Sequence, residues 1–339
     1  MNRMLLPMLV LGLLLATVRC GSAAELNAEQ EKAIAAITKL GGTVTIDEKS
    51  PGKPVILVDL HSTEITEADL ENVTKLPQLR TLHLEFARMT DAGLAHLEGA
   101  TKLQNLNLMG VAVTDGGLVH LKGLTQLQTL LLSSTQVTDA GMVNLKGLTE
   151  IQWLGLDNTQ VTDAGLKHIK GLTKIKTLWL DRTRVTDAGL ALVKGMTRLQ
   201  HLELHNTEIT DAGMANLKGL TQLQTLNLRE TKITDAGLGH IQGMTQLRYL
   251  DLHNTKITDA GMVHLKGLTQ LTGLSLWGTK VTDAGLANLR GLSQLRDIDL
   301  NGTEVTDAGA KDLEKALPKV KIWRAFDADR TKDAPTKPS

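Results

Sequence analysis

Hydrophobic and polar positions repeat along most of this chain with a period of 24 residues. The phrase Thr-Asp-Ala-Gly followed by Leu or Met, as at Thr138 and Thr162, recurs with small variations from Thr90 to Thr306. A weaker copy begins one period earlier, at Thr66. A fixed period of this size is typical of solenoids, in which each unit buries its apolar face only against its neighbours. We therefore predict one elongated repeat domain.

Each period contains the pattern of one strand and one short helix. Leu226 and Leu228 alternate with polar residues, and this period of two predicts a half-buried strand. The Thr-Asp phrase offers a hydroxyl N-cap and an acid in the first turn of a helix, whose apolar face includes Leu166. Lys170 and Gly171 predict the end of that helix, with the glycine as its C-cap.

The strand half of each period reads Leu-x-x-Leu-x-Leu-x-x-Thr followed by x-Val or x-Ile, as at Leu223, Leu226, Leu228, Thr231 and Ile233. This pattern resembles the leucine-rich repeat family over roughly residues 55 to 323, with Thr in place of the usual Asn or Cys. The period and the Thr-Asp-Ala-Gly-Leu phrase look most like bacterial secreted leucine-rich repeat proteins. They are also similar to ribonuclease-inhibitor-like and F-box-associated repeats.

The resemblance implies an α/β fold, a curved horseshoe with a parallel sheet on the concave face and short helices on the convex face. The unbroken register from Val58 to Ile298 predicts eleven repeat strands in one sheet, with one short strand added at each end. We expect an N-terminal cap of helix and strand at 25–54, about eleven 24-residue units at 55–310, a C-terminal cap at 311–326 sealed by Trp323 and Phe326, and a disordered tail at 327–339.

The first 24 residues have the features of a signal peptide. Arg3 supplies a positive end, Met4 to Val18 is an apolar run too short for a comfortable membrane span, and Ser22-Ala23-Ala24 is an acceptable cleavage site. An uncleaved anchor is the alternative. Cleavage removes Cys20, the only cysteine, so the mature protein has no disulfide. We expect a periplasmic, cell-surface or secreted protein with no remaining transmembrane span.

Charge and motifs narrow the possible functions. Removal of Arg3 and Arg19 with the signal leaves 35 bases against 37 acids, a net charge of −2, so we expect no binding to nucleic acid. No phosphate loop, dinucleotide fingerprint, zinc-protease motif or nucleophile elbow occurs. The sequence therefore predicts a monomeric protein that is not an enzyme and carries no cofactor.

The aromatic residues of the repeats indicate a binding surface. Aromatic residues form 2% of the chain, and within the repeats they occur only at variable positions in a strand or beside it. Exposed Trp and Tyr commonly anchor protein partners, so we expect a protein, or else a glycan, on the concave sheet. The alternative is that the aromatic residues have no binding role, because a solenoid tolerates any residue at these positions. The predicted surface consists of Trp153, Asp157, Trp179, Asp181, His201, Glu203, His205, Arg229, Tyr249, Asp251, His253 and Trp277.

Two further functions are open. His201, Glu203 and His205 share one face of a predicted strand. Asp157 and Asp181 occupy the position of His205 in the two preceding repeats, each of which forms one rung of the sheet. Such a cluster could hold a divalent metal or supply an acid and a base, as in a metal-dependent or acid-base enzyme. A solvated polar face explains it more simply. A ubiquitin-ligase-type substrate adaptor follows only from the repeat resemblance, and the export signal argues against it.

Overall fold

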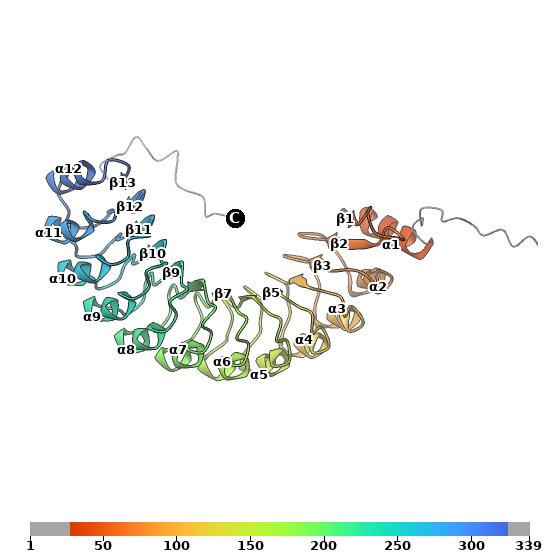
Figure 1. The fold of residues 1–339 in the computed structure, drawn as a ribbon. Helices are drawn as coiled ribbons and strands as arrows, with labels where there is room; N and C mark the ends of the chain where they lie inside the picture. The colour runs from red at the N-terminus through yellow and green to blue at the C-terminus, as the bar shows by residue number, and fades with distance from the viewer. Residues whose placement is uncertain (1–27, 325–339) are drawn as a thin grey trace, which may run out of the picture.

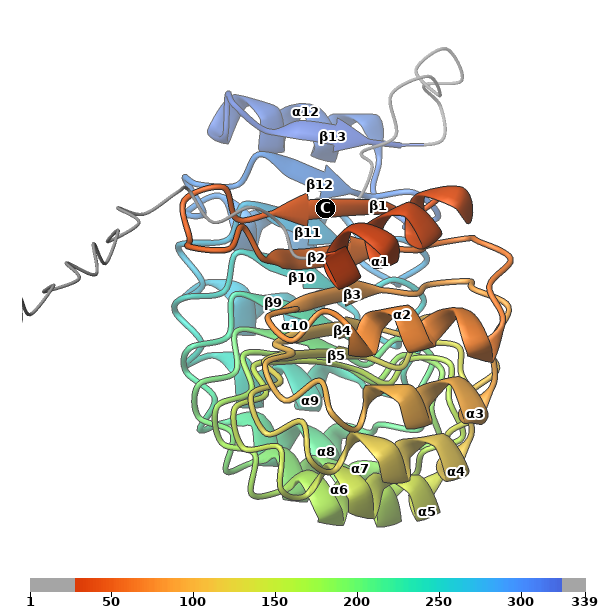
Figure 2. The same ribbon diagram turned by 90° about the vertical axis from the view of Figure 1, so that its right-hand side faces the viewer.

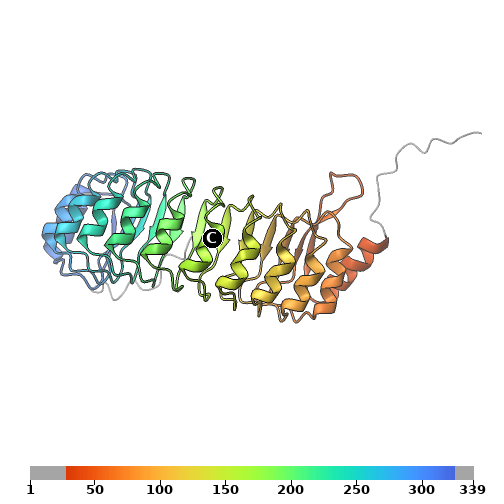
Figure 3. The same cartoon turned by 90° about the horizontal axis from the view of Figure 1, so that it is seen from below.

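The computed structural model describes residues 28–324, and these residues form a curved array of stacked units (Figure 1). Strands line the inner side of the arc, and short helices lie side by side along its outer side (Figures 1 and 3). The predicted signal peptide, Phe326 and the predicted tail lie outside the described residues. The horseshoe with a concave sheet and convex helices is confirmed.

The sheet of the described residues contains thirteen strands in chain order. Only β1, which opens the sheet, is antiparallel to its neighbour, and every later pair is parallel with a register of one full repeat, as for Val58 and Leu82. This confirms the eleven repeat strands, β2 to β12, with one strand added at each end. The strands are β1 (Thr43–Ile46), β2 (Val55–Asp59), β3 (Thr81–His83), β4 (Asn105–Asn107), β5 (Thr129–Leu131), β6 (Trp153–Gly155), β7 (Thr177–Trp179), β8 (His201–Glu203), β9 (Thr225–Asn227), β10 (Tyr249–Asp251), β11 (Gly273–Ser275), β12 (Asp297–Asp299) and β13 (Lys321–Trp323).

The helices of the repeats are mostly one α-helical turn followed by a 3₁₀ turn. The α-helices are α1 (Ala28–Lys39), α2 (Glu71–Thr74), α3 (Asp91–Leu94), α4 (Asp115–Leu118), α5 (Asp139–Met142), α6 (Asp163–Ile169), α7 (Asp187–Val193), α8 (Asp211–Met214), α9 (Asp235–Leu238), α10 (Asp259–Met262), α11 (Asp283–Leu286) and α12 (Asp307–Ala316). The 3₁₀ turns are Glu67–Leu70, Ala95–Leu97, Val119–Leu121, Val143–Leu145, Ala215–Leu217, Gly239–Ile241, Val263–Leu265 and Ala287–Leu289. In a 24-residue repeat, the strand and its flanking loops leave room for only about two helical turns before the next strand begins.

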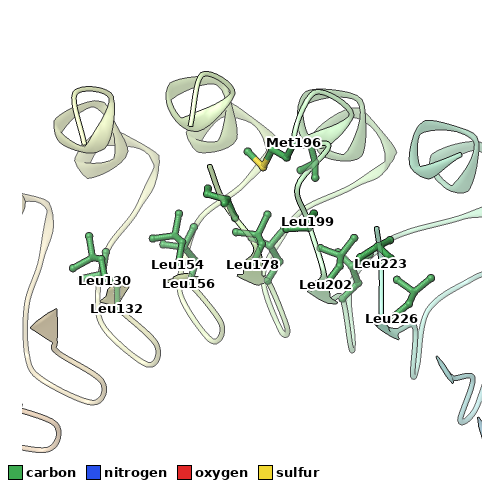
Figure 4. Packing of buried hydrophobic residues seen from close by; sticks show 14 of the residues in the cluster. Leu130, Leu132, Leu154, Leu156, Leu178, Met196, Leu199, Leu202, Leu223 and Leu226 are labelled. Carbon is green, nitrogen blue, oxygen red and sulfur yellow. The ribbon is translucent and has the colours of Figure 1, made fainter. Parts of the chain in front are cut away.

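The core is a continuous stack of leucines between sheet and helices. Leu178, Leu202 and Leu226 occupy the same place in three successive units, each 0% exposed, and Figure 4 shows how these side chains stack along the array. Met196 fills a position where most units have leucine. Because neighbouring strands are only about 4.8 Å apart, each buried side chain packs against its copies on both sides.

The last strand closes the core in a different way from the one expected. Ile322 points inward and is 8% exposed, whereas Trp323 lies on the concave side. There the Nζ atom of Lys321 lies 3.8 Å from the centroid of the Trp323 ring. Side chains alternate along a strand, so inward placement of Ile322 excludes Trp323 from the core. The predicted sealing role of Trp323 is therefore wrong.

A ladder of hydrogen bonds joins each Thr-Asp phrase to the next. Asp187 accepts one bond at Oδ1 from the Thr210 backbone N–H (2.8 Å) and another at Oδ2 from the Thr210 hydroxyl (2.6 Å). The Thr210 hydroxyl also accepts from the N–H of Ala212, as the predicted N-cap requires. The same Asp–Thr pair of bonds, 2.5–2.8 Å long, forms nine successive links from Asp91 to Thr306 and so joins ten units. The aspartate thus connects units as well as beginning its own helix.

The ladder has different chemistry at its two ends. At the start, the Oε1 atom of Glu67 replaces the aspartate and accepts from the Thr90 hydroxyl at 2.8 Å. At the end, Asp307 has no following Thr-Asp phrase, and its Oδ1 accepts from the Arg324 guanidinium at 2.8 Å. Both terminal carboxylates therefore have partners.

The glycine of the Thr-Asp-Ala-Gly phrase makes room for the ladder. A Cβ atom built on Gly213 would overlap Oδ1 of Asp187, the aspartate of the preceding unit. By contrast, a Cβ built on Gly219, near the end of the same unit's helical segment, would meet no atom within 4 Å. The glycine at that second position was expected to be the C-cap, but the C-cap of α6 is Lys170, and neither Gly219 nor Gly171 has the positive φ of a left-handed cap. That expectation is wrong.

Two alanine substitutions in one repeat test the ladder. Gly213→Ala should lower the free energy of unfolding by about 1–3 kcal/mol, because the new methyl group displaces the Asp187 carboxylate. Gly219→Ala should change it by less than about 0.5 kcal/mol in the destabilising direction. Urea denaturation followed by circular dichroism measures both. Equal effects of the two substitutions would contradict the ladder.

Truncation of a strand leucine tests the core. Leu204 is 0% exposed in the middle of the array, so Leu204→Ala should cost about 2–5 kcal/mol through the cavity it leaves between neighbouring units. Gln222→Ala, at an exposed position of the next unit, serves as the control. An unchanged denaturation midpoint for Leu204→Ala would count against this core.

Candidate functional site

The concave face presents three columns of side chains that run across the strands. The first and second columns come from the first and third residues of each three-residue strand, which are Tyr249 and Asp251 in β10. The third column comes from the second residue after the strand, which is His253 in the same unit. The middle residue, Leu250, points into the core. Neighbouring positions in a column are about 4.8 Å apart. The strands that carry the columns lie on the inner side of the arc, with the helices on its outer side (Figures 1 and 2).

The four aromatic residues of the predicted surface all lie in these columns. Trp153 and Tyr249 are in the first column, Trp179 is in the second and Trp277 is in the third. Trp153 is 50% exposed, Tyr249 41% and Trp277 45%, while Trp179 is half-buried. Large rings with this much exposure contribute little to the core and are available to a partner.

Three of the rings rest against glycines on neighbouring rungs. A Cβ built on Gly273 would lie 2.8 Å from Cδ2 of Tyr249, and one on Gly155 would lie 3.1 Å from Cε3 of Trp179. A Cβ on Gly302 would lie 3.3 Å from Cδ1 of Trp277. A larger residue at Gly273 would therefore displace the tyrosine ring. The glycines let the rings lie across the adjacent strand.

Trp277 is supported from its other side by His253. The two ring centroids are 4.5 Å apart with an interplanar angle of 36°, and His253 is only 6% exposed. We expected His253 to face a partner, but the tryptophan of the next rung covers it. The structure makes this histidine a support for Trp277.

The predicted polar residues around His205 are bonded to one another. The Nε2 atom of His205 lies 3.2 Å from Oε2 of Glu230, whose Oε1 accepts from Nε and Nη2 of Arg229 at 3.2 and 3.0 Å. Oδ1 of Asp181 accepts from the His205 backbone N–H at 2.6 Å. These contacts fix His205 and Arg229 in a preorganised cluster that extends beyond the residues predicted, because Glu230 was not among them.

Burial governs the ionisation of the histidines on this face. Burial lowers the pKa of His201. It also lowers the pKa of His205 and of His253, and the nearby Arg229 cation lowers both further. His201 also lies within hydrogen-bond distance of a neighbour, with Nδ1 3.0 Å from Oγ1 of Thr225. All three imidazoles are therefore neutral near pH 7.

The arrangement offers no metal site within the described residues. No group of three or more His, Cys, Asp or Glu side chains between residues 28 and 324 is arranged to hold an ion. Two acids of the predicted metal-binding cluster accept hydrogen bonds from the protein instead, since Asp157 Oδ1 accepts from the Ser133 hydroxyl and Asp181 accepts from the His205 backbone. Glu203 lies on the face between Trp179 and Asn227, as predicted by alternation.

None of the helices between residues 28 and 324 is both long and apolar enough to cross a bilayer.

Further residues of the face were missed from the sequence. Asp297 and Asp299 occupy the first and second columns of β12, and the same alternation that placed Tyr249 could have found them. Outside the three columns, in the loop after β3, Phe86 is 57% exposed at a positive φ of 59°, with its ring against the position of Gly110. No local pattern signals that contact, because it depends on the neighbouring rung.

Comparison with known proteins agrees with this geometry. The leucine rich repeat family profile matches residues 197–257, and the repeat pattern extends through the whole array. The chain is a leucine-rich repeat protein. No curated protein matches this leucine-rich repeat protein at a significant level.

Several solved structures share the fold of this leucine-rich repeat protein. An internalin (InlF) from Listeria monocytogenes is 22% identical with a TM-score of 0.58, over 88% of this chain and 95% of that one. Internalin C2 from the same organism is 24% identical with a TM-score of 0.50, over 66% and 92%. The functional domain of InlJ from Listeria monocytogenes, which includes a cysteine ladder, is 17% identical with a TM-score of 0.53, over 80% and 62%. At these identities the likeness concerns the fold alone.

The lowered histidine pKa values predict a loss of stability in mild acid. As pH falls below about 6.5, the unfolded chain binds protons at these histidines before the folded chain does. The free energy of unfolding should therefore decrease from about pH 6.5 downward until the folded histidines also titrate. His205→Gln should show a smaller decrease than wild type in denaturation measured at several pH values. Identical pH profiles would contradict the burial of His205.

Proposed function

We propose that the concave face is a recognition surface for a protein partner and that the protein acts by binding, without catalysis. One observation carries the proposal. A chain with 2% aromatic residues exposes Trp153, Tyr249 and Trp277 on a single face, and two of these rings rest against glycines. Rings that are already held in place lose little entropy on binding, which is the property of an anchor residue.

The spread of the rings favours a protein over a small ligand. Trp153 in β6 and Trp277 in β11 are five rungs apart, which corresponds to about 24 Å along the sheet. Trp179 and Tyr249 lie between them in the array. Anchors distributed over this length match the extent of a protein interface. A glycan is the second class of ligand that such rings could stack against.

The proposed place of action is outside the cytoplasm. This part of the proposal depends on the apolar run of residues 4–18 after Arg3 and the small residues before Glu25, which together read as a cleavable export signal. In the mature protein the stacked core, the ladder and the caps would then provide stability without disulfides, since Cys20 is the only cysteine.

The proposal is tested by an affinity series on a partner captured from the envelope or medium of the native cells. The partner is identified, purified and titrated against variants of the mature protein. Trp179→Ala and Tyr249→Ala should each weaken binding by more than about 1–2 kcal/mol with folding intact. Lys194→Ala, at an exposed helix end on the convex side, serves as the control. A partner that loses affinity only with the convex substitution would refute the concave face.

A further inference from the structure

Acidic side chains are concentrated on the concave face. The three columns from β2 to β13 contain only two bases, Arg229 and Lys321, so their formal charge is −6, although the whole chain has 37 bases and 37 acids. Other bases, such as Arg248, come just before a strand and are outside the three columns. The eight acids of the columns are Asp59, Glu85, Asp157, Asp181, Glu203, Asp251, Asp297 and Asp299. The face therefore carries a negative field that steers and retains cationic partners.

The strands β10 to β12 combine this charge with exposed rings. The intervening strand β11 presents only Gly273 and Ser275, both buried, between Asp251 of β10 and Asp299 of β12. The two aspartates are two rungs apart, so their backbones are separated by about 10 Å. Tyr249 belongs to the same β10 rung as Asp251. A cationic group placed over β11 would be within reach of both carboxylates.

Each of the two carboxylates is held in place through one of its oxygens. Asp251 Oδ1 accepts from the His253 backbone N–H at 2.9 Å. Asp299 Oδ1 accepts from the backbone N–H and Nδ2 of Asn301 at 3.0 and 2.7 Å. Within residues 28–324, Oδ2 of neither aspartate accepts a hydrogen bond. Each side chain is thus held by one oxygen and offers the other.

The aromatic residues of this region are suited to cations, because the face of an aromatic ring attracts positive charge. Two rungs beyond β11 the chain itself shows such a contact, with the Lys321 ammonium 3.8 Å from the centroid of Trp323. Burial, together with the carboxylates of Asp251, Glu203 and Asp299, raises the pKa of the Tyr249 phenol. Burial is the largest cause of this rise in pKa, and the three carboxylates add to it.

We propose that β10 to β12 bind a lysine or arginine side chain of the protein partner. Its cation lies over the exposed ring of Tyr249 or Trp277 and pairs with Asp251 and Asp299. The inference rests on the proposed function and adds the chemistry of the partner, a basic segment. The carboxylates supply charge pairing and the rings supply contact area, so loss of either should weaken binding.

The test uses a displayed library of random twelve-residue peptides, selected on the purified mature protein. Synthetic copies of the enriched peptides are then titrated by fluorescence polarisation against wild type and variants. We expect enrichment of lysine and arginine, and a loss of affinity of about tenfold in the Asp251→Asn/Asp299→Asn variant. Tyr249→Ala should also weaken binding, whereas Tyr249→Phe, which keeps the ring, should not.

A matched control removes the same charge from outside the face. Glu304→Gln/Asp312→Asn changes two acids in and before α12, and its affinity for the peptides should stay within about twofold of wild type. Equal losses in both double variants would overturn the proposal by showing only a general effect of net charge. Thermal unfolding of each variant establishes that it is folded.

Failure of this inference can be distinguished from failure of the proposed function. The enriched peptides could be neutral and lose affinity with Trp179→Ala but not with Asp251→Asn/Asp299→Asn. This result would support recognition on the concave face and overturn the basic partner. Peptides insensitive to every concave substitution would overturn both. A neutral oligosaccharide that binds wild type, loses affinity with Tyr249→Ala and tolerates the asparagine variant would overturn the basic partner in favour of a glycan.

Discussion

The fold depends on a hydrogen-bond pair between an aspartate and the threonine 23 residues after it. In each link one carboxylate satisfies both a backbone N–H and a hydroxyl of the next unit, as Asp187 does for Thr210. Leucine packing alone is non-directional and tolerates sliding, but this bidentate contact fixes how far and at what angle one unit follows another. This contact adds a directional link between the starts of successive helices to the strand pairing that aligns the concave columns.

The architecture was predictable because its signal is local and repeated. Alternation at Leu226 and Leu228 defines a strand, the period defines the stacking, and no competing pattern exists. The inter-unit role of Asp187 was not predictable, because the partner that explains it lies in the next repeat. A helix-start explanation accounts for the same residue equally well from the sequence. The predicted C-cap at Gly171 was wrong for a local reason, because Lys170 caps α6 in the right-handed region and Gly171 does not have a positive φ.

The candidate site was likewise predictable from the sequence only in part. A period of two was enough to place Tyr249 and Asp251 on the concave face and Leu250 in the core. It could not show that Trp277 covers His253, or that a glycine supports each of several rings, because those contacts join different rungs. The 24-residue period gives the register of the strands from the sequence, but the contacts between side chains of neighbouring strands appear only in the structure.

The different chemistry at the two ends of the ladder has a consequence for the length of the molecule. Glu67 begins the ladder and Arg324 ends it, while every interior link is the same. A whole 24-residue unit could therefore be duplicated or lost in the interior without creating an unpaired carboxylate at either end. Such a change would alter the span of the arc in steps of one rung, about 4.8 Å. The size of partner that the concavity encloses can thus vary by duplication alone, with the caps and the chemistry of each interior unit unchanged.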